Sequence, residues 1–310
     1  MSFLQQMAGE ESAMMERNLQ RHAQAYSIPY GTVSANQVGV MGNDHMLFIG
    51  NGANGWEQQL LGRLAMPEDW ALRWHHVLTL RRHIAEKAGL RLVHLVMPEK
   101  QVVIPDLRWP KGTEPDFAHR PFMKIPWEAA GPSVPVYPAS SFAAARDWSP
   151  VYWHGNSHCL ASSSLIAARL ALDAFGIDEP LDERNTATMT LTVAHDLMSH
   201  FHATPPEEEI LRIRRPGEIL LHRDRREENG SFTGSQYVLR NPAAPVDARL
   251  ALFGDSYCWD IGIGDIMAGI FREVHFVWSK DILWDYIGKH AISHVLWESA
   301  ERFLIKPPQR

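Results

Sequence analysis

Apolar residues recur at the spacing of a helix face in three stretches of the chain. Residues 1–25 carry Met and Leu on one side of an otherwise polar segment, which predicts a polar helix. Residues 68–88 repeat Trp, Leu, Val and Ile at helical spacing, and Gly89 follows as a helix-ending residue. Residues 160–175 are rich in small side chains and precede Gly176, which predicts a helix that packs tightly on a sheet.

Short apolar runs lie between these segments and predict strands. They occur within residues 90–100, 186–201, 249–253, 273–278 and 294–305. Further helices are predicted from Trp56 onward and over residues 261–271. Strands that alternate with helices indicate the α/β class, with a mostly parallel sheet and helices on both of its faces.

Two long segments depart from this alternation. Residues 101–140 are rich in Pro and lack periodicity, which predicts a long excursion over the surface. Residues 205–248 alternate short strands with turns, which predicts a small β-rich insertion. With residues 1–40 as a helical extension, the chain is expected to form a single domain over residues 1–310.

Charge, hydropathy and cysteine content narrow the classes of function. A formal net charge of −6 leaves no basic excess to neutralise phosphates, so nucleic acid is not expected as the main partner. No run reaches the roughly 18 apolar residues of a membrane span. The start shows no secretory signal, which predicts the cytoplasm; a true start further upstream would instead predict the periplasm. Cys159 and Cys258 are expected to be buried free thiols.

One apolar run stops abruptly at a small polar turn. Residues 250–253 are apolar, and Gly254, Asp255 and Ser256 follow them. Because ligands and catalytic groups gather at the carboxyl ends of strands in open α/β sheets, Ser256 is a candidate nucleophile. The alternative is a turn in which the Ser or Asp side chain only caps the next helix.

Six segments, taken in order, resemble the sequence blocks of a known family. They are residues 47–62 (with "GNGANG"), 92–100 (ending in "PEK"), 149–172 (with "NSHC"), 194–201 (with "HDL"), 240–257 (with "GDS") and 290–305 (with "ESAER"). Over residues 45–305 the chain resembles the SGNH-hydrolase-like domain of the alginate O-acetyltransferase family, which acetylates exopolysaccharides. The resemblance implies a three-layer α/β/α fold with flavodoxin-like topology.

The resemblance also implies roles for three side chains. Ser256 would be the nucleophile and His158 its general base, a task that suits histidine because it exchanges a proton near neutral pH. The family's acid falls at Asn156, where this chain has an amide. The base precedes the nucleophile in the chain, which is no obstacle because triads are defined by geometry.

The amide at Asn156 leaves three outcomes open. In the first, another carboxylate takes over, the candidates being Asp255, Asp196 and Glu298, although Asp255 fits better as a structural residue that ties the turn. In the second, the serine and histidine act as a dyad. In the third, catalysis is lost, because exchanging the acid of a comparable triad for an amide costs about 10⁴-fold.

Several polar residues near these blocks are candidates for substrate or oxyanion contacts. The backbone N–H of Ser256 is the natural donor to a tetrahedral oxyanion, with Asn156 or Asn241 as a second donor. Tyr257 and Lys100 are further candidates, although a lysine after Pro-Glu is also typical of a solvated loop.

Histidine and tryptophan positions raise two further alternatives. Two histidine pairs have spacings seen in zinc sites but lack a third ligand, namely His154 with His158 and His200 with His202. Neither a metal nor a cofactor is therefore expected, apart from an acetyl donor as cosubstrate. Three tryptophans are candidates for a sugar-binding groove, with core packing as the alternative: Trp153, Trp259 and Trp278.

The expected function is O-acetyl transfer to a polysaccharide or glycan precursor through an acetyl-serine intermediate. A serine acetylesterase would use the same residues with water as acceptor, and an impaired member would only bind carbohydrate or act as a scaffold. The expected partners are a carbohydrate polymer or oligosaccharide and an acetyl-donating membrane protein. The family implied by the resemblance acts outside the cytoplasm, in contrast to the location that the start of the chain predicts.

Overall fold

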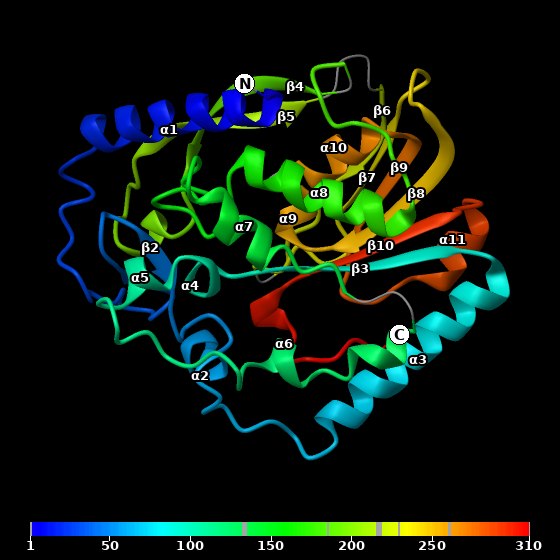
Figure 1. The fold of residues 1–310 in the computed structure, drawn as a ribbon, viewed down its shortest axis with the longest axis horizontal. Helices are drawn as coiled ribbons and strands as arrows, with labels where there is room; N and C mark the ends of the chain where they lie inside the picture. The colour runs from blue at the N-terminus through cyan, green and yellow to red at the C-terminus, as the bar shows by residue number, and fades with distance from the viewer. Residues whose placement is uncertain are drawn as a thin grey trace.

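The computed structural model describes residues 2–131, 135–184, 186–214, 219–228, 230–259 and 262–309 (Figure 1). The helices are α1 (Phe3–Arg21), α2 (Trp56–Leu60), α3 (Trp70–Ala88), α4 (Lys100–Val103), α5 (Pro105–Arg108), α6 (Pro121–Lys124), α7 (Ala139–Ala145), α8 (Ala161–Phe175), α9 (Ser256–Trp259), α10 (Ile263–Ala268) and α11 (Trp284–Lys289). The 3₁₀ turns are η1 (Trp127–Ala130), η2 (Met198–His200) and η3 (Glu301–Phe303). The strands are β1 (Gly39–Met41), β2 (Leu47–Ile49), β3 (Arg91–Met97), β4 (Ala187–Ala194), β5 (Glu207–Arg214), β6 (Ile219–Asp224), β7 (Gln236–Arg240), β8 (Val246–Gly254), β9 (Phe271–Trp278) and β10 (His294–Ala300).

A mixed sheet with strand order β3-β10-β8-β9-β7-β6 forms the centre of the fold. β3, β10, β8 and β9 run parallel, whereas β7 and β6 continue the sheet antiparallel beyond β9. Two antiparallel pairs, β1 with β2 and β4 with β5, lie outside this sheet. The predicted α/β class with a mostly parallel sheet is therefore confirmed.

The order of the parallel strands is a circular permutation of the flavodoxin-like order. If β8 is counted as the first strand, β9 is the second, β10 the third and β3 the fourth, and their order across the sheet is 2-1-3-4. β3 takes the fourth place although it is the earliest of these strands in the chain. The connections reverse direction between β8 and β10, and ligands bind at the carboxyl ends of strands at such a switch point. Residues that follow β8 therefore lie where this sheet is best suited to hold a site.

Helices cover both faces of the sheet around β8 (Figure 1). Because side chains alternate along a strand, Leu250 and Leu252 join the apolar cluster of α8 and α10. Ala251 and Phe253 join the opposite cluster, which contains α3 and α11. All four side chains are fully buried, so the end of β8 is fixed by packing on both sides.

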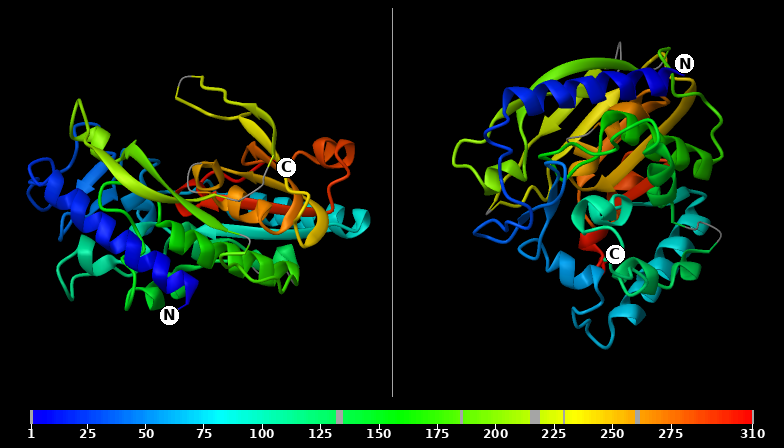
Figure 2. Two further views of the ribbon diagram at one scale, coloured as in Figure 1. Left: turned by 90° about the horizontal axis from the view of Figure 1, so that it is seen from above. Right: turned by 60° about the vertical axis from the view of Figure 1, so that its left-hand side comes forward.

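The strongly periodic helices are confirmed, with α1, α3 and α8 in the predicted segments. Gly89 and Gly176 follow α3 and α8 with φ of 64° and 72°, the left-handed conformation that ends a helix. α1 lies alongside the β4–β5 ribbon (Figure 2), where the Asn18 side chain donates a hydrogen bond to the backbone carbonyl of Glu209.

Other predicted segments differ from the structure. Residues 101–140 are not only a surface excursion, because short helical turns bury Val103, Ile104 and Ile125 in the core. The helix predicted over 261–271 is shorter, since α10 ends at Ala268 and β9 begins soon after it; residue 261 lies outside the described residues.

The segment predicted as a β-rich insertion is divided between two sheets. β5 pairs with β4, whereas β6 and β7 extend the central sheet from β9. Figure 2 shows the β6–β7 hairpin projecting from the body of the fold. Among the described residues, no helix has both the length and the apolar character needed to cross a bilayer.

Candidate active site

The turn after β8 holds Ser256 at the first position of α9. Asp255 fixes this turn, because its carboxylate accepts hydrogen bonds from the backbone N–H groups of Tyr257 (3.1 Å) and Ala300 (2.9 Å). The Asp255 N–H in turn donates to Oε2 of Glu298 at 3.0 Å. The expected structural role of Asp255 thus agrees with its contacts, which tie the serine turn to β10.

His158 lies beside the serine, on the loop that precedes α8. Its Nε2 is 2.7 Å from Oγ of Ser256, and its Nδ1 is 2.8 Å from Oδ1 of Asn156. The backbone N–H of His158 donates to the same Oδ1 at 3.0 Å, which identifies that atom as the amide oxygen. Nδ1 therefore carries the proton, and Nε2 is free to accept the proton of the Ser256 hydroxyl.

Asp196 lies on the far side of the histidine from the serine. Its carboxylate accepts hydrogen bonds from Oγ (2.5 Å) and the backbone N–H (2.7 Å) of Ser157, and Oδ2 is 4.0 Å from Nδ1 of His158. Partial desolvation opposes ionisation, but the nearby His158 and the bonds from Ser157 lower the pKa of Asp196 below its usual range. An ionised carboxylate thus contacts Ser157, the residue that follows Asn156 in the chain.

Glu298 does not supply this charge. Its side chain is buried, and burial together with the negative charge of Asp255 raises its pKa well above the usual range. Oε2 accepts from the Asp255 N–H at the start of the serine turn. Of the three candidate carboxylates, Asp196 is the one beside His158.

Lys100 is neither a solvated loop residue nor a substrate contact. The side chain is 2% exposed, and Nζ donates to the backbone carbonyls of Leu47 (2.9 Å), Trp153 (2.5 Å) and His154 (3.4 Å). Burial lowers its pKa to about 7, and the three carbonyls satisfy its donors. The Lys100 ammonium group therefore holds the segment of Trp153 and His154, which leads to Asn156, by hydrogen bonds.

The predictions for Asn241 and Tyr257 are also wrong. Asn241 precedes β8, so it lies at the opposite end of that strand from Ser256. Its side chain is buried, donates to the carbonyl of Ala268 and accepts from the N–H of Ala243. The Tyr257 hydroxyl is buried and donates to the Ser157 carbonyl at 3.3 Å. Its ring supports His158 edge-on, with centroids 4.8 Å apart, instead of facing a substrate.

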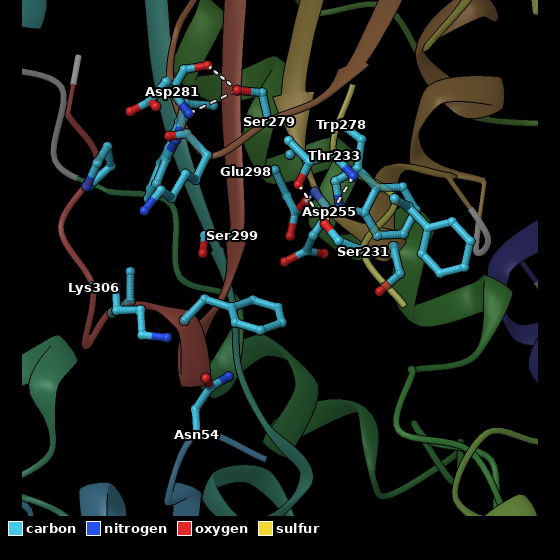
Figure 3. A pocket seen from close by; sticks show the side chains of 18 of the residues that line it. Asn54, Ser231, Thr233, Asp255, Trp278, Ser279, Asp281, Glu298, Ser299 and Lys306 are labelled. Carbon is cyan, nitrogen blue, oxygen red and sulfur yellow. Dashed lines mark hydrogen bonds between the residues drawn. The ribbon is translucent and has the colours of Figure 1, made fainter. Parts of the chain in front are cut away.

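A cavity of about 790 Å³ opens onto Ser256 (Figure 3). Figure 3 shows Ser231, Thr233 and Trp278 along one side and Lys306 across from them. The ring of Phe232 lies beside that of Trp278, tilted by 39° with centroids 5.1 Å apart, and the two rings give the cavity an aromatic wall. Among the tryptophans predicted for a sugar groove, Trp278 lines the cavity, whereas the side chains of Trp153 and Trp259 are buried in the core.

The paired histidines have partners other than a metal. His158 contacts Ser256, His200 contacts Asn36, and His202 contacts the Ala25 carbonyl. In the described part of the chain, no three His, Cys, Asp or Glu side chains are grouped to hold a metal ion. The predicted free, buried state of the two cysteines is confirmed.

Some residues of the site carry no sequence signal. Ser157 lies between Asn156 and His158, and nothing local in the sequence indicates a role for it. Its hydroxyl joins the site because it donates a hydrogen bond to Asp196, 39 residues later. The cavity wall includes the tip of the β6–β7 hairpin and the C-terminal residues around Phe303 and Lys306. Turn residues indicate such a hairpin, but no local pattern shows that its tip reaches the serine.

The sequence matches no family model and no curated protein. The fold matches PatB1 of Bacillus cereus with a TM-score of 0.61 and 10% identity, over 86% of this chain and 98% of PatB1. It also matches a DHHW family protein of Eubacterium siraeum (TM-score 0.61, 12% identity, 90% and 96% covered). A third match is the O-acetyltransferase domain of Pseudomonas putida AlgJ (TM-score 0.53, 16% identity, 86% and 92% covered).

The chain thus shares the fold of proteins that include the O-acetyltransferase domain of AlgJ, in agreement with the fold that the resemblance of its sequence blocks implies. The neighbours cover nearly the whole of this chain and nearly the whole of their own.

Proposed function

We propose that the protein is an O-acetyltransferase that carries an acetyl group on Ser256 and delivers it to a hydroxyl group of a glycan. The observation that carries this proposal is the array of Ser256, His158 and Asn156, with contacts of 2.7 and 2.8 Å, in which Ser256 also lines a cavity of about 790 Å³. The likeness in fold to the AlgJ O-acetyltransferase domain supports the same reaction class.

In the first step, Oγ of Ser256 attacks the carbonyl carbon of the acetyl donor. Nε2 of His158 takes the hydroxyl proton as the C–O bond forms, and Asn156 holds the ring in the tautomer that can accept it. The imidazolium then returns this proton to the leaving group of the donor, which leaves acetyl-Ser256. A backbone N–H in the first turn of a helix has no acceptor within the helix, so the Ser256 N–H is a donor for the oxyanion.

In the second step, the acceptor hydroxyl attacks the acetyl carbon. His158 removes its proton and passes it to Oγ of Ser256 as the acyl bond breaks. The aromatic wall of Trp278 and Phe232, beside the hydroxyls of Ser231 and Thr233, suits a sugar ring. With water in place of the sugar, the same residues would act as an acetylesterase. An acetyl-donating membrane protein remains the expected source of the acetyl group.

The test uses a chromogenic acetyl ester with and without neutral and uronate-containing oligosaccharides. Acetylated oligosaccharide from the wild type supports transfer, whereas release of acetate alone at an unchanged rate supports the esterase. Ser256→Ala must abolish both products, and Ser140→Ala, at an exposed position of α7 that does not line the cavity, is the matched control for loss of a serine hydroxyl. A wild-type protein that is folded, binds oligosaccharide and shows no Ser256-dependent turnover would refute the catalytic proposal.

A covalent probe gives an independent measure of the nucleophile. A structure of PatB1 carries a sulfonyl adduct, and sulfonyl fluorides modify activated serine hydroxyls. We expect an aryl sulfonyl fluoride to add once to the wild type at Ser256, as shown by peptide mass spectrometry. Labelling at other serines, with Ser256 untouched, would contradict its role as the activated hydroxyl.

A further inference from the structure

Two side chains face the outer edge of the His158 ring, and each has one of the two properties of a triad carboxylate. Asn156 accepts the hydrogen bond from Nδ1 but carries no charge. Asp196 carries a charge but makes no direct hydrogen bond to the ring, since Oδ2 is 4.0 Å from Nδ1. We propose that Asn156 orients His158 and that Asp196, a positioning residue acting through Ser157, stabilises the imidazolium; this inference rests on the proposed function.

The hydroxyl group of Ser157 bridges the Asp196 carboxylate and the His158 ring. Oγ of Ser157 is 2.5 Å from Oδ2 of Asp196 and 3.4 Å from Nδ1 of His158. The Ser157 hydroxyl donates to the carboxylate, so its lone pairs face the protonated Nδ1. The carboxylate charge is thus held near the ring without displacing Asn156.

The backbone keeps Asp196 in this place. The N–H groups of Leu197 and Met198 donate to the carbonyl of Gly155 at 3.1 and 3.2 Å. The Asp196 carboxylate accepts from the backbone N–H of Ser157 (2.7 Å) and of Leu197 (2.8 Å). The turn after β4 and the loop before α8 are thereby joined as one unit around the histidine.

Electrostatics explains why this carboxylate contributes to the rate. Opposite unit charges about 4 Å apart attract weakly in water and several times more strongly near a protein surface. His158 is positive only while it holds the serine proton, so this attraction favours the transition state over the resting enzyme. Among the described residues, other charged or titratable groups around the pair include Arg302, Lys100 and His195, and the ring of Tyr257 packs against His158.

The experiment is a double-mutant cycle on the Ser256-dependent hydrolysis of an acetyl ester between pH 5 and 9. Asp196→Asn is expected to lower kcat/KM by about 10- to 100-fold. The acid limb of the profile should move to lower pH, because the imidazolium is less stable without the carboxylate. Arg302, Lys100 and His195 are present in every variant, but the charge of Asp196 also acts on the pKa values of Lys100 and His195, so the rescue by Asn156→Asp below is what ties the shift to His158. Asp147→Asn, at an exposed turn, is the matched control and should leave the profile unchanged.

The decisive arm places a carboxylate at position 156. In the wild-type background, Asn156→Asp should change kcat/KM by less than about threefold, because a charge is already present. In the Asp196→Asn background, the same substitution should restore most of the lost activity and return the acid limb to its original position. A rescue of this kind requires a missing charge and cannot follow from a purely structural role of Asp196.

Three results would overturn the inference. They are a wild-type profile for Asp196→Asn, a loss that Asn156→Asp does not rescue, and a tenfold or larger gain from Asn156→Asp alone. If Asp196→Asn does not fold, Ser157→Ala keeps the carboxylate and removes the bridge, and it should lower kcat/KM about 3- to 10-fold with a smaller shift of the limb.

A measurement without turnover separates this inference from the proposed function. The ring resonances of His158, followed by NMR in the wild type and in Asp196→Asn, should titrate at lower pH in the variant. That shift would support the role of Asp196 even if the protein showed no acetyl transfer. Identical titration of the two proteins would refute it even if the enzyme were active.

Discussion

Nε2 of His158 lies 2.7 Å from Oγ of Ser256, although 98 residues separate them in the chain. The contact exists because β8 ends at the switch point of the sheet and the loop before α8 reaches the same edge. In this permuted strand order, β8 comes late in the chain. The base therefore precedes the nucleophile in sequence while both meet in the usual geometry.

Asn156→Ala should be far more damaging than Asn156→Asp. The alanine removes the acceptor for Nδ1–H, so the ring is no longer held in the tautomer that accepts the serine proton. We expect kcat/KM for an acetyl ester to fall by about 10³- to 10⁴-fold, as when a triad holds the wrong tautomer. Circular dichroism would verify the fold, and an alanine variant within threefold of the wild type would show that Asn156 does not orient His158.

Gly254→Ala should displace the nucleophile turn. A Cβ at this position would lie 2.5 Å from Oε2 and 3.1 Å from Cβ of Glu298, so the buried Glu298 carboxylate, which accepts from the Asp255 N–H, would have to move. We expect a loss of about 1–3 kcal/mol in the free energy of unfolding, with a fall of at least tenfold in ester hydrolysis.

Gly9→Ala is the matched control for that substitution. It lies within α1 with open space around it, so alanine should leave activity unchanged and should not destabilise the protein. Urea unfolding and kcat measured on both variants would check the pair. Equal behaviour of the two variants would mean that the close approach of Gly254 to Glu298 does not matter.

The position of the nucleophile could be predicted from the sequence because its signals are local. An apolar run followed by Gly-Asp-Ser is sufficient to place Ser256 at the end of a buried strand. Asn241 is near the same motif in sequence, but β8 spans nine residues and rises about 3.3 Å per residue, which takes the two to opposite edges. Strand direction thus separates residues that proximity in sequence groups together.

Burial and long-range partners could not be predicted in the same way. Lys100 looks like a loop residue until the carbonyls of Trp153 and His154, more than 50 positions away, surround its ammonium group. Asp196 is one of three candidate carboxylates, and the contact between the turn after β4 and the Asn156 loop distinguishes it from Glu298. Contacts between residues so distant in the chain produce no pattern of hydrophobic and polar positions from which they could be predicted.

Trp278→Ala should impair the use of a glycan acceptor more than hydrolysis of a small ester. The ring lines the cavity beside Phe232, where it can stack on a sugar, and its other aromatic neighbours are Trp259 and Phe276, not His158. We expect the KM for an oligosaccharide acceptor to rise by about tenfold, with kcat for the chromogenic ester within threefold.

Trp148→Ala serves as the control for removal of a large aromatic side chain. Trp148 is 36% exposed and does not line the cavity, so its loss should change neither constant. Acceptor titrations monitored by mass spectrometry of the acetylated sugar would measure the effect. An unchanged acceptor KM in Trp278→Ala would place the glycan elsewhere on the protein.

Glu11 should make the stability of the protein depend on pH near neutrality. This buried side chain joins α1 to the start of α8, where it accepts hydrogen bonds from the backbone of Ala161 (2.7 Å) and from the Ser162 hydroxyl (2.5 Å). Burial raises its pKa from 4.5 to about 7, against the effect of these hydrogen bonds. Because the folded state binds the proton more tightly, the stabilisation is complete below about pH 4.5 and is lost as pH rises through about 7.

Replacing Glu11 with Gln should remove this dependence. Between pH 5 and 8 the wild type should lose about 1–3 kcal/mol more of its free energy of unfolding than Glu11→Gln does. Urea titrations at pH 5, 6, 7 and 8 measure that difference, and other titrating groups cancel because both proteins contain them. Glu16→Gln, on the exposed side of α1, is the control and should follow the wild-type curve. Parallel curves for the wild type and Glu11→Gln would show that Glu11 binds its proton equally in the folded and unfolded states.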